Sequence, residues 1–457
     1  MFDISCFKAY DIRGTVPDQL DADLAWRLGR AFAAEFAPRA VVVGRDVRHT
    51  SPELAGALVR GLTAGGADVS DLGLCGTEEV YFATAHSRAD GGIMVTASHN
   101  PREYNGLKFV GPGATPISGD SGLFALRDRI VAGDFGPDPD RTGSVQPLSN
   151  RENYIDKLMS FVDRSALAPL RIVVNAGNGC AGPILDALEP RLPFTLIKIH
   201  HDPDGSFPNG VPNPLLPECR AATAAAVRAQ GADLGLAWDG DGDRCFFYDE
   251  QGEFIEGYYL VGLLAGRLLQ THPGATILHD PRLIWNTRDI VTRLGGHPIM
   301  TKTGHAFVKA RMRQEDAVYG GEMSAHHYFR DFAYCDSGMV PWLLVAQALS
   351  TEGRPLSSLV SDMIRAYPAS GEINLRLSDP DAAMDRLAAC YLAQAQAVDH
   401  VDGLSLDLGA WRFNVRRSNT EPLLRLNVES RGDRELMAAK TREVLSLLEA
   451  PFPTETA

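Results

Sequence analysis

The densest group of side chains that could take part in catalysis or bind a ligand lies in the stretch WDGDGDR, residues 238–244. Three aspartates fall within five residues there. Asp239, Asp241 and Asp243 are separated by glycines, which let the backbone bend so that the carboxylates can converge. Carboxylates held this close repel one another, so a bound cation is the natural explanation. Oxygen ligands alone favour Mg²⁺ or Ca²⁺ over zinc. The stretch therefore predicts a divalent-cation site, with a solvated acidic turn as the alternative.

Two known patterns compete for the same stretch. The calcium-loop spacing D-x-D-x-D-G-x₅-E is nearly met, because Glu250 stands at the twelfth position, but Arg244 stands at the sixth, where that loop needs glycine. The flanking runs also read as strand and hairpin and not as two helices. The second pattern, an apolar strand followed by D-x-D, is similar to haloacid-dehalogenase-type phosphatases, whose nucleophile would be Asp239. Their fifth position is usually Thr or Val, and Asp243 at that position favours a third metal ligand.

A second stretch, GGIMVTASHNP at residues 91–101, ends an apolar run in Ser98, His99 and Asn100. A serine in a polar turn is structural in most proteins. A Ser–His protease is excluded because the stretch has no G-x-S-x-G elbow and adjacent side chains on an extended backbone point apart. A nucleophilic role for Ser98 gains support from other polar residues that follow apolar runs, namely Arg13, Lys108, His305, Glu322, Ser324, His326, Arg416, Ser418, Asn419 and Thr420. The last four lie in RRSNTEP, a donor-rich loop suited to a phosphate.

The elements that must position these residues share one format, in which an apolar run of β type is followed at once by glycine and polar residues. Examples are AVVVGRDVRH, GGIMVTASHN, LRIVVNAGNG, ADLGLAWDGDGDR, ATILHDPR, GHPIMTKTGH and AVYGGEMSAHH. Near-continuous apolar runs are typical of parallel strands buried on both faces. Helical stretches such as TSPELAGALVRGL lie between them. This alternation predicts α/β units, whose ligands bind at the carboxyl ends of the strands, where these polar residues fall.

The end of the chain has a different pattern. The runs WRFNVRRSN and LLRLNVES alternate apolar and polar residues, as half-exposed antiparallel strands do, and an amphipathic helical stretch follows. These features predict a smaller α+β domain that begins near residue 370. The Pro/Gly/Ser-rich segment 133–150 is a linker candidate. We expect four domains, with boundaries at 1–146, 147–252, 253–368 and 369–457.

The composition limits the class of protein. At 457 residues, with 45% hydrophobic and 22% charged residues, the chain is expected to be globular with several domains. No uncharged apolar run reaches the ~18 residues of a membrane span, and we expect no signal peptide and no membrane partner. Seven scattered cysteines without a CxxC pair indicate reduced thiols and a cytoplasmic protein. A formal net charge of -14 argues against nucleic-acid binding.

Four motifs, TASHNP, DGDGDR, GEMSAHH and RRSNTEP, occur in this order and together resemble those of the α-D-phosphohexomutase superfamily, in its bacterial phosphomannomutase/phosphoglucomutase branch. The resemblance extends over essentially the whole chain. It implies an α/β fold in which three similar α/β domains with mixed sheets and a C-terminal α+β domain surround a central cleft. The first domain would carry a phosphoserine, the second the metal loop, the third a sugar-recognition loop and the fourth a phosphate-binding loop.

The resemblance also assigns roles to individual residues. Ser98 would be the phosphoserine, and its phosphate would complete a Mg²⁺ site made by Asp239, Asp241 and Asp243. The other residues assigned to catalysis are His99, Lys108, Arg13 and Arg244, with the general base left open between Lys108 and His99. The residues assigned to the substrate are Arg282, His305, Glu322, Ser324, His326, Arg416, Ser418, Asn419 and Thr420. Two positions depart from the pattern, since Arg282 stands where some members have Lys and Arg417 is an additional arginine.

The reaction that the resemblance implies is an isomerisation, in which hexose 6-phosphate and hexose 1-phosphate interconvert through a phosphoserine and a hexose 1,6-bisphosphate. Mannose is the expected sugar, with glucose also accepted, and glucose 1,6-bisphosphate or mannose 1,6-bisphosphate would be the activator. The substrate would thus be a phosphosugar, and we expect a monomer or a weak dimer. Such phosphoryl transfer relies on positioning and on charge stabilisation by Mg²⁺ and cationic side chains. The alternatives are a phosphoglucomutase, a phosphatase with Asp239 as its nucleophile, and a calcium-regulated sugar-binding protein.

Overall fold

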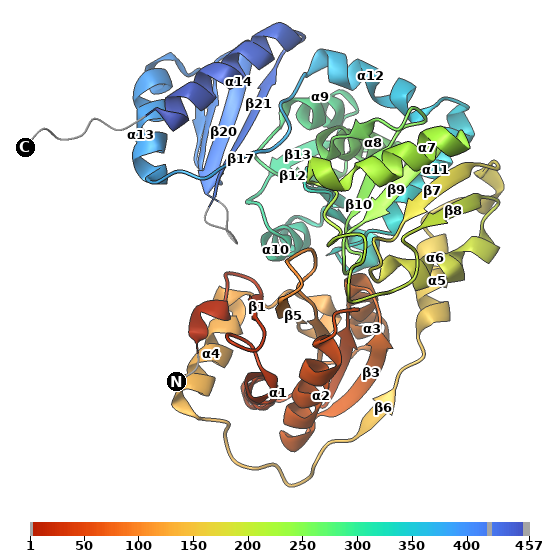
Figure 1. Ribbon diagram of the computed structural model, residues 1–457, viewed down its shortest axis with the longest axis vertical. Helices are drawn as coiled ribbons and strands as arrows, with labels where there is room; N and C mark the ends of the chain where they lie inside the picture. Colours follow the sequence, from red (N-terminus) through yellow and green to blue (C-terminus); the bar gives the residue numbers. More distant parts are fainter. Residues whose placement is uncertain (1–2, 418–422, 451–457) are drawn as a thin grey trace, which may run out of the picture. The chain divides into compact units, whose positions relative to one another are not determined.

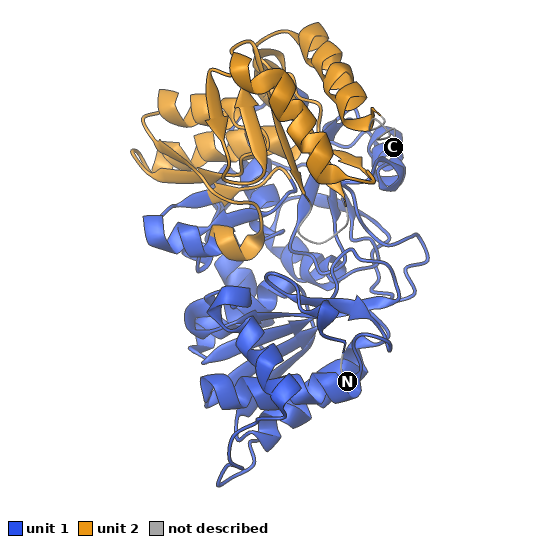
Figure 2. Cartoon of the chain, turned by 90° about the vertical axis from the view of Figure 1, so that its left-hand side faces the viewer, with its two compact units in different colours: residues 1–255, 309–319, 324–357 blue, residues 256–308, 320–323, 358–457 orange. Residues whose placement is uncertain are grey.

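The computed structural model describes residues 3–417 and 423–450, and within these residues the strands form four β-sheets flanked by helices (Figure 1). The chain divides into two compact units, which Figure 2 shows in different colours. Unit 1 comprises residues 1–255, 309–319 and 324–357. Unit 2 comprises residues 256–308, 320–323 and 358–457.

The first sheet is mixed and has the strand order β1-β5-β4-β2-β3-β6. The apolar runs AVVVGR and GGIMV form central strands, with β2 parallel to β3 and β4, whereas β5 is antiparallel to β1 and β4. The strands are β1 (Ile12–Thr15), β2 (Ala40–Arg45), β3 (Asp68–Leu74), β4 (Gly91–Val95), β5 (Tyr104–Val110) and β6 (Val145–Pro147). The helices of this part are α1 (Ala22–Phe36), α2 (Ser51–Ala64), α3 (Thr77–Ser87) and α4 (Leu123–Ala132).

The second sheet has the order β11-β10-β9-β7-β8 and is also mixed. Its strand β7 is parallel to β8 and β9, and β10 is antiparallel to β9 and β11. The strands are β7 (Arg171–Asn175), β8 (Thr195–Ile199), β9 (Leu234–Trp238), β10 (Cys245–Tyr248) and β11 (Phe254–Ile255). The helices are α5 (Arg151–Met159), α6 (Ala181–Leu188) and α7 (Ala221–Gln230).

The third sheet has the order β13-β12-β14-β15-β16, with β12 parallel to β13 and β15 antiparallel to β16. Its strands are β12 (Thr276–His279), β13 (His297–Met300), β14 (Tyr319–Gly321), β15 (His327–Phe329) and β16 (Cys335–Asp336). The helices are α8 (Gly257–Thr271), α9 (Trp285–Arg293), α10 (His305–Glu315), α11 (Val340–Glu352) and α12 (Leu356–Ala366).

The fourth sheet is antiparallel throughout, with the order β17-β21-β20-β19-β18. The two alternating runs of the sequence pair with each other as β20 and β21, as predicted. The strands are β17 (Ile373–Leu375), β18 (Ala397–Asp399), β19 (Leu404–Asp407), β20 (Trp411–Arg417) and β21 (Leu424–Ser430), and the helices are α13 (Pro380–Tyr391) and α14 (Arg434–Glu449). The predicted fold class, three α/β parts with mixed sheets and a C-terminal α+β part, is therefore confirmed.

Two sequence predictions about the class of protein can be compared with the structure. All seven cysteines lie within the described ranges and are free thiols, and most of them are buried. In the part of the chain that the structure describes, no helix is both long enough and apolar enough to cross a bilayer.

A buried carboxyl group ties the start of α3 to two other segments of unit 1. Glu78 accepts hydrogen bonds from the Tyr154 hydroxyl on α5 and from the backbone amide of Gly338, at 2.6 Å in the latter case. Burial raises the pKa of Glu78 from its ordinary value of 4.5 to about 8, because its hydrogen-bond donors offset only part of the desolvation of the charged form. The folded protein therefore holds this proton more tightly than the unfolded chain does.

This difference predicts a pH-dependent stability. The contribution of Glu78 is fully present below about pH 4.5, where both states are protonated, and is lost as the pH rises to about 8. We expect the melting temperature of the wild type to fall by a few degrees relative to that of Glu78→Gln between these limits. Melting curves of both proteins at several pH values test this expectation, and parallel curves over the whole range would contradict it.

Candidate active site

The three aspartates of the DGDGD stretch lie in the loop between β9 and β10. Asp239, Asp241 and Asp243 are buried, and their carboxylates offer oxygens within 4.8 Å of one another. Asp241 Oδ1 and Asp243 Oδ1 are among the buried atoms without a hydrogen-bond partner within the described residues. Unpartnered buried oxygens are costly unless a ligand takes them. This carboxylate group therefore fits a divalent cation with oxygen ligands.

The strands on either side of this loop exclude the calcium-hand alternative. β9 and β10 are antiparallel neighbours with Trp238 opposite Cys245, so the loop closes a hairpin, whereas a calcium hand has a helix at each end. Glu250, which would be the twelfth ligand, accepts a backbone hydrogen bond from Ser357 at 3.3 Å. The interpretation of this stretch as a calcium hand is therefore wrong.

Lys108, on β5, contacts two of the three aspartates directly. Its Nζ donates to Asp241 Oδ2 at 2.7 Å and to Asp243 Oδ2 at 2.6 Å. Burial alone would lower the pKa of Lys108, but the two carboxylates outweigh this effect and raise the pKa above its usual range. Burial, followed by the charge of Asp241, raises the pKa of Asp243. Even with the lysine present, the group has an excess of negative charge that a cation would relieve.

Ser98 lies beside this carboxylate group, in the loop that follows β4. Its Oγ donates to Asp239 Oδ2 at 2.7 Å and lies 3.0 Å from His99 Nδ1. The side chain is buried, and the residue has a left-handed backbone with a φ of 50°. A Cβ atom on Gly240 would lie 2.4 Å from the Ser98 carbonyl oxygen, so this glycine permits the close approach of the two loops. The TASHNP and DGDGDR motifs are therefore in direct contact.

Two arginines and a histidine surround the serine side of this site. Arg244 Nε donates to Asp239 Oδ2 at 2.9 Å, and the Arg244 guanidinium also contacts His99 Nδ1. Arg13, on β1, donates to the side-chain oxygen of Asn100 at 2.5 Å. Burial and the charge of Arg244 hold the pKa of His99 well below its usual range, so the ring is neutral. The structure therefore brings these three predicted residues together around one loop.

Thr77, the first residue of α3, is a site residue that the sequence analysis did not find. Its Oγ1 donates to Asp241 Oδ2 at 2.5 Å, and its amide donates to the Asp241 carbonyl oxygen at 3.0 Å. Both bonds fix the middle aspartate of the loop. A signal was present, because Gly76 and Thr77 follow the run LGL in the same format as the other strand ends.

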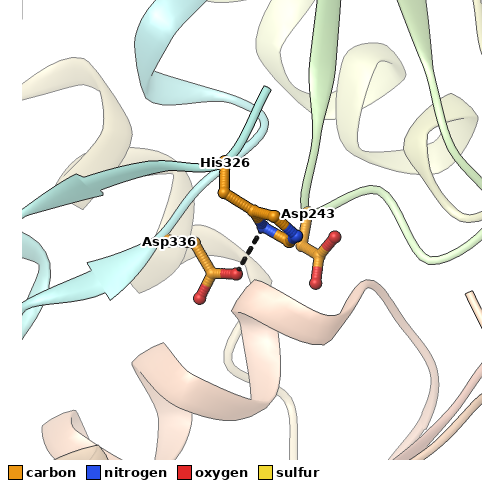
Figure 3. A group of neighbouring side chains, drawn as sticks. All are labelled: Asp243, His326 and Asp336. Atoms are coloured by element: carbon orange, nitrogen blue, oxygen red, sulfur yellow. Dashed lines mark ion pairs between the residues drawn. The ribbon is translucent and has the colours of Figure 1, made fainter. Parts of the chain in front are cut away.

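A second group of possible metal ligands, Asp243, His326 and Asp336, adjoins the first (Figure 3). The His326 ring lies between the two carboxylates, with Nδ1 3.0 Å from Asp336 Oδ2. Lys309 Nζ lies 2.6 Å from Asp336 Oδ1 and 3.7 Å from the centre of the Tyr81 ring. The lysine therefore supplies positive charge to Asp336 within this group. Lys309 and Asp336 were not predicted from the sequence.

Other predicted residues lie in unit 2, around a buried arginine. Arg282 donates to Asp280 at 2.7 Å and to Glu372 at 3.1 Å, and it lies 3.7 Å from Glu322. Glu322 Oε1 accepts a hydrogen bond from the amide of Gly304 at 3.0 Å. These three carboxylates fix the orientation of the guanidinium.

Glu372 also holds two arginines of the fourth sheet. It lies 3.5 Å from Arg416 and 3.3 Å from Arg425. Burial alone would raise its pKa, but Arg282, Arg425 and Arg416 outweigh this effect and lower the pKa to about 2. Arg416 and Arg425 are directly opposite each other on β20 and β21. The position of Arg425 opposite Arg416 could have identified it as a further site residue, because residues directly opposite each other share one face of a sheet.

The remaining predicted residues are placed as follows. His305 is the first residue of α10, and Ser324 is half-buried in the loop before β15. Arg417 has an exposed side chain that pairs with Asp381. Ser418, Asn419 and Thr420 lie outside the described residues.

Four family models match the chain in order. Phosphoglucomutase/phosphomannomutase alpha/beta/alpha domain I matches residues 5–135, domain II residues 152–252, domain III residues 256–367, and the C-terminal domain residues 372–446. The chain belongs to the phosphoglucomutase/phosphomannomutase family. It is therefore an isomerase, a phosphohexose mutase, and the acidic group described above could bind a metal ion.

Similar proteins span the same length. A phosphomannomutase of Salmonella montevideo is 59% identical over 454 residues, which cover 98% of this chain and 100% of the relative. A protein of Xanthomonas campestris described as phosphohexose mutases is 57% identical over 445 residues, covering 97% and 99%. The crystal structure of a phosphoglucomutase/phosphomannomutase family protein from Burkholderia thailandensis matches with a TM-score of 0.88 at 35% identity, covering 99% and 100%.

Proposed function

We propose that the chain interconverts mannose 6-phosphate and mannose 1-phosphate, and also the glucose phosphates, through a phosphorylated Ser98. The observation that carries this proposal is the 2.7 Å contact between Ser98 Oγ and Asp239, inside a carboxylate group that fits a divalent cation. Relatives named phosphomannomutase at 59% and 56% identity support mannose as the sugar. The sugar passes through a hexose 1,6-bisphosphate, and glucose 1,6-bisphosphate or mannose 1,6-bisphosphate phosphorylates the serine initially.

We infer that the cation is Mg²⁺, held by Asp239, Asp241, Asp243 and the phosphate of Ser98. When bound, Mg²⁺ would offset the negative charge of the transferring phosphoryl group. Lys108 and Arg244 supply further positive charge from the protein, since both contact the carboxylates that would hold the ion. Cations fixed in place before the reaction stabilise developing charge without the cost of reorientation.

The proton of the Ser98 hydroxyl has two candidate acceptors from the sequence. His99 Nδ1 lies 3.0 Å from Ser98 Oγ, whereas the Lys108 ammonium donates to Asp241 and Asp243. A general base must lie within hydrogen-bond reach of the proton that it removes. His99 Nδ1 lies within this reach, but it also contacts the Arg244 guanidinium, which has only N–H donors, and the Ser98 hydroxyl donates to Asp239. We therefore propose that the base is either Lys108 or His99, and that Lys108 supplies positive charge while it is protonated.

We propose that the sugar and its second phosphate are held by the residues that the motifs assign to the substrate: Arg282, His305, Glu322, Ser324, His326, Arg416, Ser418, Asn419 and Thr420. The bisphosphate must turn end for end between the two transfers, so that either phosphate can face Ser98. The second phosphate site must therefore accept both orientations. The guanidinium of Arg416, together with small hydroxyl and amide donors, suits this requirement. These groups would bind the phosphate alone, so the sugar ring could face either way.

Replacement of Arg416 by alanine tests this phosphate site. We expect Arg416→Ala to raise KM about 10- to 100-fold for mannose 1-phosphate and glucose 1-phosphate alike, because a charged hydrogen bond to phosphate is lost in either orientation. The matched control is Arg417→Ala, whose side chain is exposed and pairs with Asp381. Steady-state kinetics of both variants supply the measurement. An unchanged KM in Arg416→Ala, or equal effects of the two substitutions, would contradict the assignment.

The sugar is tested by a coupled assay that compares mannose 1-phosphate with glucose 1-phosphate, in the presence of Mg²⁺ and a trace of glucose 1,6-bisphosphate. We expect turnover of both sugars, with the higher kcat/KM for mannose 1-phosphate. A markedly higher kcat/KM for glucose 1-phosphate would favour the phosphoglucomutase alternative. Turnover that is independent of Mg²⁺ and of the bisphosphate would contradict the cofactors proposed above.

Three further parts of the proposal concern the whole protein. We infer that it is cytoplasmic, which its seven free cysteines support, and that it acts as a monomer or a weak dimer. We also keep the domain boundaries 1–146, 147–252, 253–368 and 369–457 as a proposal. Sedimentation analysis tests the oligomeric state, and a tight tetramer would contradict it.

A further inference from the structure

Arg48, which follows β2, has a side chain that is buried in the first domain of unit 1. Its guanidinium donates four hydrogen bonds to main-chain carbonyl oxygens, three in the loop between β4 and β5 and one on the first residue of β5. The acceptors and distances are Ser98 at 2.9 Å, Asn100 at 2.6 Å, Pro101 at 2.7 Å and Tyr104 at 2.8 Å. One side chain thus spans the whole loop that carries the serine.

A second series of hydrogen bonds links Ser98 to Asp46. The Ser98 amide donates to Thr96 Oγ1 at 2.8 Å, and Thr96 Oγ1 donates to Asp46 Oδ2 at 2.7 Å. Asp46 Oδ2 also lies 3.4 Å from Arg48 Nε. Both the amide and the carbonyl group of Ser98 are therefore fixed by one buried group of three side chains, Asp46, Arg48 and Thr96.

The backbone of Ser98 requires such support. Its φ of 50° lies in the left-handed region, which a non-glycine residue adopts at a cost and keeps only where its surroundings fix it. This conformation directs Oγ to Asp239, 2.7 Å away. A loop released from its anchors would relax toward a less strained backbone and carry Oγ away from the carboxylates.

We propose that Arg48, supported by Asp46 and Thr96, is a positioning residue that holds the Ser98 loop in the geometry needed for phosphoryl transfer. This inference rests on the proposed role of Ser98 as the phosphoryl carrier. Arg48 acts through the loop and not on the sugar. A lysine cannot replace it, because an ammonium group lacks the planar fork of donors that reaches four carbonyl oxygens at once.

The test compares Arg48→Lys with Arg30→Lys. Arg30, on α1, is a matched control, because it is also buried in the first domain and donates to a main-chain carbonyl, that of Ala64, at 2.5 Å. For Arg48→Lys we expect kcat to fall about 10- to 100-fold, as happens when a group that orients a reacting residue is lost. We expect KM for mannose 1-phosphate to stay within about twofold of the wild-type value, because the sugar contacts are untouched. Arg30→Lys should lower the melting temperature without lowering kcat.

A second readout follows the serine itself. The rate at which glucose 1,6-bisphosphate phosphorylates Ser98 should fall in Arg48→Lys by the same factor as kcat. Thr96→Val, which replaces the hydroxyl between Asp46 and the Ser98 amide by a methyl group, supplies the same test if Arg48→Lys does not fold, with an expected loss of about 10-fold.

Three outcomes would overturn the inference. The first is a folded Arg48→Lys or Thr96→Val protein with wild-type kcat and labelling rate, and the second is an equal loss of kcat in Arg30→Lys. Both leave the proposed function intact, because the wild type in the same experiment is still labelled on Ser98. The third, a wild type that turns over without label on Ser98, would remove the premise and overturn the proposed role of the serine as well.

Discussion

Ser98→Ala is expected to lower kcat by roughly 10⁴-fold or more while leaving the protein folded. The reason is that the hydroxyl is the proposed acceptor and donor of the phosphoryl group. Its Oγ contacts the polar side chains of Asp239 and His99, so the alanine variant loses hydrogen bonds and no carbon atom of the side chain. The measurement is the coupled mutase assay, with circular dichroism and a melting curve to establish folding.

The matched control is Ser87→Ala. Ser87 is an exposed serine at the end of α3, and its hydroxyl donates to the Ala83 carbonyl oxygen within the same helix. This variant should retain the wild-type kcat. If Ser98→Ala retained near-wild-type turnover, Ser98 would not be the nucleophile, whatever the melting curves showed.

Asp241→Asn is expected to lower kcat by more than about 100-fold and to raise the Mg²⁺ concentration needed for half-maximal activity. The reason is that losing a metal ligand weakens metal binding more than losing a residue that only hydrogen-bonds to a ligand. Asp241 is the middle carboxylate of the group. Its Oδ1 is buried and has no hydrogen-bond partner among the residues that the structure describes, while Oδ2 accepts from Lys108 and Thr77. The amide keeps the size of the side chain but removes its charge. Activity as a function of MgCl₂ concentration and calorimetric titration with Mg²⁺ measure the two effects.

Asp249→Asn is the control for this experiment. Asp249 lies in the turn between β10 and β11, and its carboxylate accepts hydrogen bonds from the amides of Gln251 and Glu253, both at 2.9 Å. Removal of this charge should leave the Mg²⁺ dependence unchanged. An Asp241→Asn protein with the Mg²⁺ dependence of the wild type would contradict the metal site.

The strand ends could be predicted from the sequence because their signal is local. An apolar run followed by glycine and polar residues marks a buried strand and the loop at its carboxyl end, and such loops gather at one edge of a sheet. Ser98 and Asp239 lie at two of these ends and are in contact, although their contact joins different sheets. The antiparallel pairing of β20 with β21 followed from alternation of apolar and polar residues in the same way.

The residues that the sequence did not identify depend on packing between distant segments. Arg48, Lys309 and Glu372 are charged residues of ordinary appearance in the sequence, and each acquires its role only from partners in other elements. Lys108 was predicted as a candidate general base, and its contacts with Asp241 and Asp243 could not be read from its own motif. The predicted central cleft between the domains stays a prediction.

The identity of the group that carries the phosphate tests the central claim most directly. The protein is incubated with Mg²⁺ and glucose 1,6-bisphosphate, digested, and its phosphorylated peptide is identified by mass spectrometry before and after treatment with alkali or hydroxylamine. We predict one phosphate on the peptide that contains Ser98, labile to alkali and stable to hydroxylamine. A hydroxylamine-labile acyl phosphate on the peptide that contains Asp239 would contradict the account and favour the phosphatase alternative.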